Sequence, residues 1–592
     1  MLAAAWLALS STALAGGDPR EVLVVTNAED DDAQAIAEHY AVSRELPHGR
    51  ICALSGLDPT TTELSFADYD SLVVPAIDAC LAALPDPDAI HLLVTTRGLP
   101  YRVDLGAGYD VGFEALLQVH HTVARSDGSP LAGAPQTDLG GYFAASVGNP
   151  AFIGGRASTT GCDFDESNDY AAWYTAACRL LNGDDLPLPF DRHGSWDGGT
   201  WLMAHNLFIV TRLDGFDADD AMDLVDRGVA ADGTFPTAPL LCMHGADSAR
   251  GARDPECELV VRRLSEAGLN ADWIDTFDGG LSGWTIAGYL TGAASMTGAI
   301  ADNTYVPGAI TDNLTSYGAV PTNFFCDETG EVCPASESQT SVARFIRAGA
   351  TGAHGTVAEP LNNVAPNASL YLLYTFGYSL GESYFFSQRY LYWQNLVLGD
   401  PLTTPYATRP TLSWSHHTAP EDGTLTLTAH HPHGIARVRV FQADLLVAEA
   451  EGAELTLHAE ELGASGDVVE LYAVAEAAPT TVSRPGWEAD THTVTAGTRG
   501  WTWSTLTLTD AEGAPDTGDP TDTGEPIEAP DTGTPSDPTV EPDGDGGDKS
   551  SGCTTVGASS VGLVWLAALI GVGHRREPFH VERHPGERTS CA

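Results

Sequence analysis

Residues 281–320 read LSGWTIAGYLTGAASMTGAIADNTYVPGAITDNLTSYGAV and contain two apolar runs, 284–290 and 308–314, each followed by small polar residues. Short apolar runs bounded by turn-forming residues are typical of strands that are buried on both faces of a sheet. In a parallel α/β sheet, the ligand crevice lies beyond the carboxyl ends of such strands. We therefore expect a site where these two strands end, at residues 291–295 and 315–316.

Apolar strands alternate with helical patterns on both sides of this stretch. On the N-terminal side we expect strands at 21–27, 50–56 and 89–100 and helices at 33–44 and 69–84. Further along the chain we expect strands at 206–213, 238–245, 270–277, 352–358 and 395–399, with helices at 217–231, 257–267, 340–348 and 370–374. This alternation predicts a parallel doubly wound α/β sheet within residues 16–408. The irregular stretch 107–199 is interpreted as loops that cover the sheet.

After residue 410 the apolar period changes from that of helices to two. Short alternating runs such as GTLTLTAHH, GIARVRVFQA and VVELYAVAE are separated by Gly, Asp and His turns. About a hundred residues of this pattern without a long helical segment predict an all-β sandwich of immunoglobulin type. We assign it to residues 409–510.

The two ends of the chain carry segments typical of export. Residues 1–15 form an apolar run ending in a small-residue pattern, which predicts a signal peptide cleaved after Ala15. Residues 511–552 form an acidic spacer rich in Pro, Thr, Asp and Gly, which buries too little apolar surface to fold. Residues 553–576 join Cys553 to a short apolar run and two arginines, which predicts a membrane-associated tail. The extension 577–592 is left unassigned.

The net charge of -53, from 81 acidic and 28 basic residues, excludes nucleic acid as a partner class, because little would neutralise the phosphates. No cofactor or metal site is predicted. A structural calcium site is left open where Asp163, Asp165, Ser167 and Asp169 alternate, although Tyr174 stands where an EF-hand requires a bidentate glutamate.

Ten cysteines are compatible with an oxidising compartment outside the cytoplasm. Their proximity in sequence predicts four local disulfides. The expected pairs are Cys52 with Cys80, Cys162 with Cys178, Cys242 with Cys257, and Cys326 with Cys333.

The motifs LLVTTRGLP, TRLDG, VPGAITDNLTSYGA, GATGAHGTVAEP and LVLGDPL together resemble a family of exported bacterial proteins of unassigned activity that often carry C-terminal sorting tails. Residues 511–576 are similar to the sorting tails of myxobacterial surface proteins, which implies processing near Cys553 and anchoring at the cell surface, or release. More distantly, the order of parts resembles gingipain-type cysteine peptidases. That resemblance implies a caspase-like α/β fold.

In gingipain-type peptidases one strand ends in a catalytic histidine and the next ends in a nucleophilic cysteine. The resemblance places the histidine position on Ala293 and the cysteine position on Thr315 or Ser316. An alanine side chain cannot accept a proton, and an unassisted hydroxyl is a poor nucleophile. With these replacements, the resemblance implies a degenerate peptidase-like module that binds an unknown peptide or protein ligand.

An active hydrolase with a different residue set is the alternative. Ser316 would act with His354 or His244 and an acid such as Asp312, and Glu359 would take part. No G-x-S-x-G elbow supports this set. The sequence identifies neither a ligand for the binding module nor a substrate for the hydrolase.

Several arginines and acids follow predicted strand ends and form a second candidate site. They are Arg97, Arg102, Arg212, Asp214, Glu359 and Asp400. Their convergence would allow recognition of a carboxylate ligand, whereas buried ion pairs among them would only fix loop geometry. The sequence leaves both interpretations open, recognition of a carboxylate ligand and a structural role as buried ion pairs.

Overall fold

The computed structural model describes residues 17–106, 110–120, 147–148, 207–296, 299–320, 339–359, 364–388, 390–391, 394–420, 423–464, 466–478, 481–482, 492–493 and 499–509. The chain divides into two compact units, Met1–Pro515 and Asp516–Ala592, and every described residue belongs to the first. The expected signal peptide, spacer, tail and extension lie outside the described residues. Within these residues no helix combines the length and apolar character that crossing a membrane requires.

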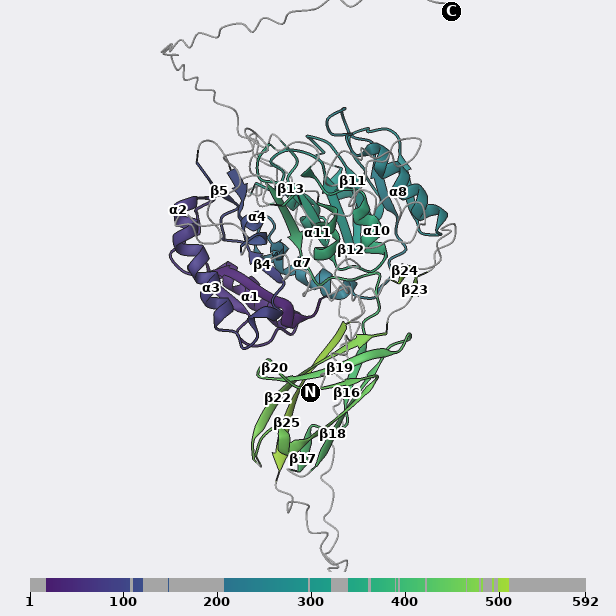
Figure 1. Cartoon of the computed structure of the whole chain (residues 1–592). Coiled ribbons are helices and arrows are strands. Elements are labelled where there is room, and N and C mark those ends of the chain that lie inside the picture. Colours follow the sequence, from purple (N-terminus) through teal and green to yellow (C-terminus); the bar gives the residue numbers. More distant parts are fainter. Residues whose placement is uncertain are drawn as a thin grey trace, which may run out of the picture. The chain divides into compact units, whose positions relative to one another are not determined.

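A ten-stranded sheet forms the centre of the N-terminal part (Figure 1). Its spatial order is β10 (Ala271–Ile274), β9 (Leu240–Met243), β11 (Thr285–Thr291), β12 (Thr304–Asn313), β13 (Gly352–Thr356), β15 (Asn395–Gly399), β8 (Ile209–Leu213), β4 (Leu92–Thr96), β1 (Val22–Asn27) and β2 (Ile51–Leu54). Neighbouring strands run parallel from β10 to β13 and again from β8 to β2. β15 pairs antiparallel with β13, so that Gly399 lies opposite Gly352.

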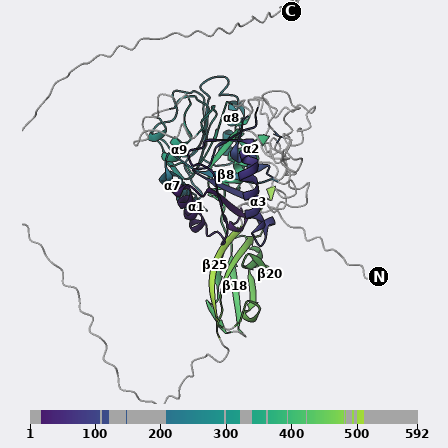
Figure 2. The same ribbon diagram turned by 90° about the vertical axis from the view of Figure 1, so that its left-hand side faces the viewer.

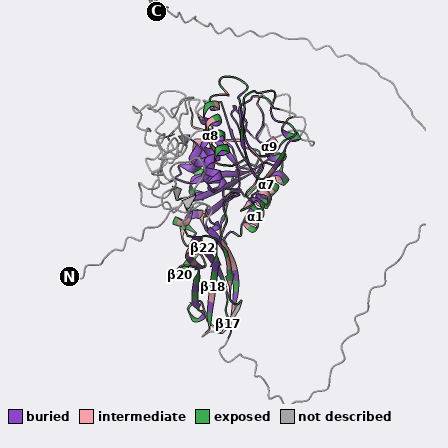
Figure 3. Cartoon of the chain, turned by 90° about the vertical axis from the view of Figure 1, so that its right-hand side faces the viewer, coloured by how far each residue is buried: buried purple, intermediate pink, exposed green. Residues whose placement is uncertain are grey.

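Helices connect these strands and cover the sheet. They are α1 (Asp31–Ser43), α2 (Phe66–Asp68), α3 (Val74–Ala82), α4 (Phe113–Gln118), α7 (Ala218–Ala231), α8 (Asp254–Glu266), α9 (Ala343–Arg347), α10 (Ser369–Thr375) and α11 (Leu380–Ser387). α1 packs against α7, as Figure 2 shows, and α10 packs against α8 and α11. Because helices remove both faces of the sheet from water, burial at every position is found in strands β1, β4, β8, β9, β13 and β15. Figure 3 shows buried residues gathered in the interior of this part of the chain.

Three buried tyrosines fix α10 and α11 to the sheet. The hydroxyl of Tyr371 donates to the carbonyl oxygen of Leu241 at 2.8 Å, and that of Tyr374 donates to Gly308 at 2.9 Å. Tyr384 donates to the carbonyl oxygen of Thr311 at 2.8 Å. Each phenol thus satisfies its polar group while its ring adds apolar area to the core.

Small β elements complete the first unit. β3 (Glu63–Ser65), β5 (Arg102–Asp104) and β6 (Asp110–Gly112) form a three-stranded sheet, and β7 (Val147–Gly148) pairs with β14 (Tyr390–Leu391).

The C-terminal β domain has a three-stranded sheet of β16 (Thr411–Trp414), β18 (Thr424–His430) and β21 (Glu454–His458). Its five-stranded sheet contains β17 (Thr418–Pro420), β25 (Arg499–Thr509), β22 (Val468–Ala477), β19 (Ile435–Gln442) and β20 (Leu445–Glu451). β23 (Thr481–Val482) pairs with β24 (His492–Thr493).

The expected fold class is confirmed: a large, mostly parallel sheet with helices is followed by an all-β domain. The interpretation of 107–199 as loops is wrong at its start, because β6 and α4 lie there. The sequence patterns also missed α11, although Ser379 and Glu382 form a capping box at its start.

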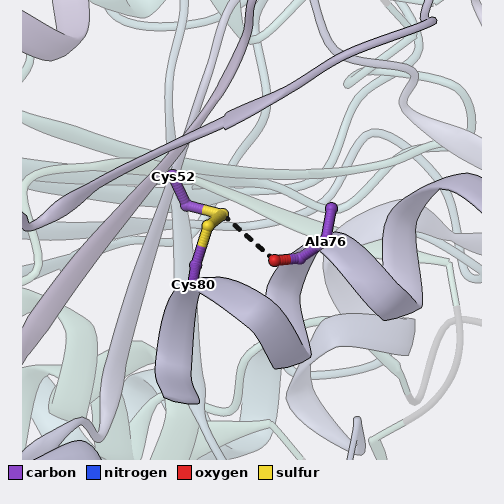
Figure 4. The surroundings of a disulfide bond; sticks show 3 residues. All are labelled: Cys52, Ala76 and Cys80. Atoms are coloured by element: carbon purple, nitrogen blue, oxygen red, sulfur yellow. Dashed lines mark hydrogen bonds between the residues drawn. A yellow bond between two sulfur atoms is a disulfide. The ribbon is translucent and has the colours of Figure 1, made fainter. Parts of the chain in front are cut away.

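The disulfide predictions have mixed outcomes. Cys52 of β2 and Cys80 of α3 form the predicted bond, with Cα atoms 5.7 Å apart, and Figure 4 shows the Cys52 sulfur beside the carbonyl oxygen of Ala76. The predicted bond between Cys242 and Cys257 is absent, and both residues are buried free thiols. The remaining predicted pairs lie outside the described residues.

Candidate functional site

Three parallel neighbours, β11, β12 and β13, end at the same edge of the sheet and build the candidate site. Thr291 at the end of β11 lies opposite Asn313 of β12, and Asp312 lies opposite His354 of β13. Because parallel strands present their carboxyl ends together, these positions form one crevice. This is the edge at which the sequence predicted a site.

A buried network of charged and polar side chains lies just inside this edge. His354 Nδ1 bonds to Asp312 Oδ1 at 2.6 Å, and His354 Nε2 bonds to the Asn395 amide oxygen at 3.0 Å. Arg253, which precedes α8, forms an ion pair with the other carboxylate oxygen of Asp312. All four side chains are buried. Both ring nitrogens of His354 therefore have partners within the fold.

Arg253 ties several backbone segments together at the same place. Its guanidinium donates to the carbonyl oxygens of Thr291 at 2.6 Å, Asp312 at 3.0 Å and Pro366 at 3.0 Å. The acceptors come from β11, from β12 and from the segment before α10. Arg253 thus fixes the ends of two strands against the segment that leads into α10.

The electrostatics of the network favour an ionised Asp312. Burial alone would raise the pKa of Asp312, but the charges of Arg253 and His354 outweigh it and hold the pKa of this carboxyl below its usual range. Burial raises the pKa of the neighbouring Glu256 to about 8, although Arg253 and the amides of Ala368 and Ser369 oppose the shift. Charge therefore outweighs burial at Asp312, whereas burial outweighs charge at Glu256.

A cavity of about 230 Å³ opens above the network. Its polar lining is formed by Arg250, Asn313, Thr315, Ser316, His354, Thr356 and Glu359. The structure thus brings the three candidate catalytic residues, Ser316, His354 and Glu359, to one cavity. Ser316 is half-buried, Glu359 is exposed, and neither makes a hydrogen bond or ion pair with the described residues.

The hydroxyl side chains at the end of β12 are not arranged as an activated nucleophile. The Thr315 hydroxyl donates to the side-chain oxygen of Gln339. Ser316 is followed by Tyr317 in the left-handed backbone region, with a φ of 56°. Among the residues that the structure describes, no hydrogen bond joins Ser316 to His354, and His354 Nε2 is occupied by Asn395.

Ala293, the position that the resemblance assigned to a histidine, is a buried backbone anchor. Its amide donates to the Asn313 side-chain oxygen at 2.7 Å, and its carbonyl accepts from the Asn313 amide at 2.9 Å. A Cβ on the preceding Gly292 would lie 2.2 Å from the carbonyl oxygen of Arg250. Gly292 therefore allows the loop before α8 to cross the end of β11 and carry Arg250 to the cavity.

The expected arginine and carboxylate crevice does not form as one site. Arg212 is buried, with ion pairs to Glu114 at 2.9 Å and Asp214 at 2.8 Å, and Arg97 contacts Asp214 at 3.2 Å. These charges compensate one another around the ends of β4 and β8. This arrangement corresponds to the second alternative, in which buried ion pairs fix loop geometry.

Two further members of that set lie elsewhere. Arg102 pairs with Glu63 and with Asp110, at 3.4 Å from the latter, within the small sheet. Asp400 accepts from the Tyr40 hydroxyl at 2.9 Å and pairs with Arg44 at the end of α1. Because β15 is antiparallel to β13, Asp400 follows a strand end at the edge where β13 begins, not at the crevice.

His244, the alternative histidine of the hydrolase hypothesis, lies outside the site, and the described residues form no metal site. His244 is about half exposed; its Nε2 lies 3.4 Å from Asp254, and it does not line the cavity. Over the described ranges, no group of three or more His, Cys, Asp or Glu side chains gathers to hold a metal ion. The possible calcium loop at 163–169 lies outside those ranges.

Sequence reasoning missed three residues that organise the site: Arg253, Asn395 and Arg250. Arg253 stands directly before the Asp254-Pro255 pair that begins α8, and Asn395 begins a strand. Their sequence separations from their partners are 59 residues to Asp312 and 41 to His354. Only the position of Arg253 before a helix start could have drawn attention to it.

No protein-family model and no curated protein matches this sequence. Among solved structures, the chain is similar to the crystal structure of the Arg-specific cysteine proteinase gingipain R (RgpB), with 10% identity, 84% of this chain and 100% of that chain covered, and a TM-score of 0.37. The complex of Porphyromonas gingivalis RgpB pro- and mature domains gives 10% identity, coverages of 82% and 100%, and a TM-score of 0.36. A structure described as a protease gives 10% identity, coverages of 82% and 97%, and a TM-score of 0.36. These values describe a distant likeness in fold and carry no conclusion about activity.

Proposed function

We propose that this chain is a non-catalytic binding module whose crevice, at the ends of β11, β12 and β13, holds a small polar ligand or a short peptide segment. The observation that carries the proposal is the position of His354 Nε2, which faces the Asn395 amide at 3.0 Å instead of a hydroxyl. A general base must reach the proton that it removes. Freeing Nε2 would break a hydrogen bond inside a buried, charged network.

The cavity itself favours ligand binding. It combines apolar walls with polar groups that have no partner among the described residues, namely Ser316 and Glu359. Concave sites of this composition are typical of ligand recognition. The rigid network below the cavity supplies preorganisation, which lowers the entropic cost of binding.

An active hydrolase is the second candidate function. The 2.6 Å bond between Asp312 and His354 Nδ1 has the arrangement that orients a histidine in Ser-His-Asp enzymes, and Ser316 lines the same cavity. Catalysis would require the Asn395 amide to leave Nε2. Ser316 would then act as the nucleophile and Glu359 would contact the substrate.

Turnover measurements on pooled ester and peptide substrates separate the two candidates. The binding module predicts that the wild type and His354→Gln hydrolyse them equally slowly, at the rate of the His244→Gln control. His244 is the matched control because it lies outside the cavity. Turnover that disappears in His354→Gln, while the thermal transition shows a folded protein, would establish the hydrolase.

We also propose that the protein is exported and held at the bacterial cell surface, or released from it. Residues 1–15 and 553–576 support this as sequence features, and the Cys52–Cys80 disulfide is compatible with an oxidising compartment. Mass spectrometry of the surface fraction should find Gly16 as the first residue and no peptide beyond the processed region near Cys553. Protein confined to the cytoplasm with its N-terminus intact would refute this proposal.

A further inference from the structure

Two unlike charges line the same cavity. Arg250 and Glu359 both contribute to its wall. Glu359 is exposed and makes no ion pair with the described residues. Its carboxylate therefore remains available to a cation in the cavity.

Arg250 keeps donor capacity although it is partly engaged. Nη1 pairs with Asp247 at 2.6 Å, and Nη2 donates to Gln339 at 3.3 Å. Nε is buried and has no hydrogen-bond partner in the described structure. Each Nη carries two N–H donors and uses one of them in these contacts, so one donor on Nη1 and one on Nη2 remain for an incoming anion.

The space between these charges is small and partly apolar. Pockets for drug-sized ligands measure about 300–1,000 Å³, and this cavity measures about 230 Å³. Leu314, Val364 and Ala365 form apolar wall, and the Ser316 hydroxyl is available for a hydrogen bond. These features restrict the ligand to a few heavy atoms with a charge at each end.

We propose that the ligand is a small zwitterion, a free amino acid or a short peptide with both termini free. This inference rests on the proposed binding function. The ligand carboxylate pairs with Arg250, its ammonium pairs with Glu359, and Ser316 donates to or accepts from its polar centre. Carboxylate recognition by a guanidinium fork is directional, so the anionic end fixes the orientation of the ligand.

Calorimetric titration of the full chain tests this inference with glycine, β-alanine, γ-aminobutyrate and glycylglycine as the probes. This series varies the distance between the two charges, and one member should bind most tightly. The N-acetyl and amide derivatives of that member should each bind about tenfold more weakly, because each lacks one charge-assisted contact.

Two variants assign the contacts. Arg250→Gln should lose the preference for the free carboxylate over the amide, and Glu359→Gln should lose the preference for the free amine over the N-acetyl form. Arg262→Gln and Glu258→Gln are matched controls, because this exposed pair on α8 does not line the cavity. If Arg250→Gln does not fold, Arg250→Lys keeps the charge without the fork and should weaken carboxylate binding.

The outcomes separate this inference from the proposed function. Equal binding of the zwitterion and its blocked derivatives would overturn the ligand class and leave the binding function standing. Absence of binding by every zwitterion to a folded protein would also overturn the ligand class. Hydrolysis of the blocked derivatives that depends on His354 would overturn the proposed function itself.

Discussion

Replacing Arg253 by methionine tests the buried network most severely. The substitution removes the guanidinium that pairs with Asp312 and that donates to Thr291 and Pro366. Removing one partner of a buried ion pair costs about 3–5 kcal/mol, because the other charge stays buried without compensation. Arg253 and Asp312 are both buried, so no discount for solvent screening applies. We expect a loss of about this size in the free energy of unfolding at pH 7.

Urea denaturation at several pH values measures this loss and its origin. The pKa of Asp312 is depressed in the folded protein, so its stabilisation is present above the unfolded pKa of about 3.9 and is lost as the pH falls through the folded pKa. The difference between wild type and Arg253→Met should therefore shrink at the most acidic pH. Arg262→Met is the control, because its side chain is 56% exposed and should change stability by no more than about 0.5 kcal/mol. A loss below about 1 kcal/mol for Arg253→Met at pH 7 would refute the network.

Three further predictions concern separate parts of the fold. Gly292→Ala should destabilise the protein by about 1–3 kcal/mol in the same denaturation assay, because its Cβ would meet the Arg250 carbonyl oxygen at 2.2 Å; unchanged stability would contradict the close approach. The folded pKa of Glu256 is raised to about 8, so this group should make wild-type stability decrease as the pH rises from about 4.5 to 8. Glu256→Gln should lessen that decrease, and an identical pH profile in the two proteins would exclude the raised pKa. Cys52→Ser should lower the free energy of unfolding by about 3 kcal/mol in thermal or urea unfolding, since the bond to Cys80 closes a 28-residue separation. The control is the wild type with added reductant, which should lose stability only after the reductant is added.

The strands and the edge that holds the site could be predicted from sequence because their signals are local. Apolar runs followed by small polar residues identified β11 and β12 to within a few residues. The carboxyl-end rule then predicted the crevice at residues 291–295 and 315–316, which directly follow the observed ends of β11 at Thr291 and β12 at Asn313. The residues near that edge, Ser316 and His354, consequently appeared as candidates before their contacts were known.

The direction of β15 and the partners of buried charges could not be predicted from sequence. Asp400 follows a strand end like the others, but β15 is antiparallel to β13, so its end lies away from the crevice. Nothing in the local pattern of Asn395 to Gly399 reports that direction. The same limit applies to His354, whose partners Asp312 and Asn395 lie on two neighbouring strands.

The predicted disulfide between Cys242 and Cys257 shows a further limit of proximity in sequence. The two cysteines lie on β9 and in the first turn of α8, and both are buried free thiols. Burial raises the pKa of the Cys242 thiol, which disfavours the thiolate that disulfide formation requires. Spacing along the chain identified the neighbours but not their redox state.

Covalent labelling tests the central claim, that the crevice binds without catalysis, most directly. The folded protein would be treated with broad serine- and cysteine-directed activity probes and analysed by mass spectrometry of its peptides. We expect no adduct at Ser316 or Thr315, because His354 Nε2 is held by Asn395 and assists neither hydroxyl. A stoichiometric adduct at Ser316 that disappears in Asp312→Asn would contradict this expectation and identify an active hydrolase.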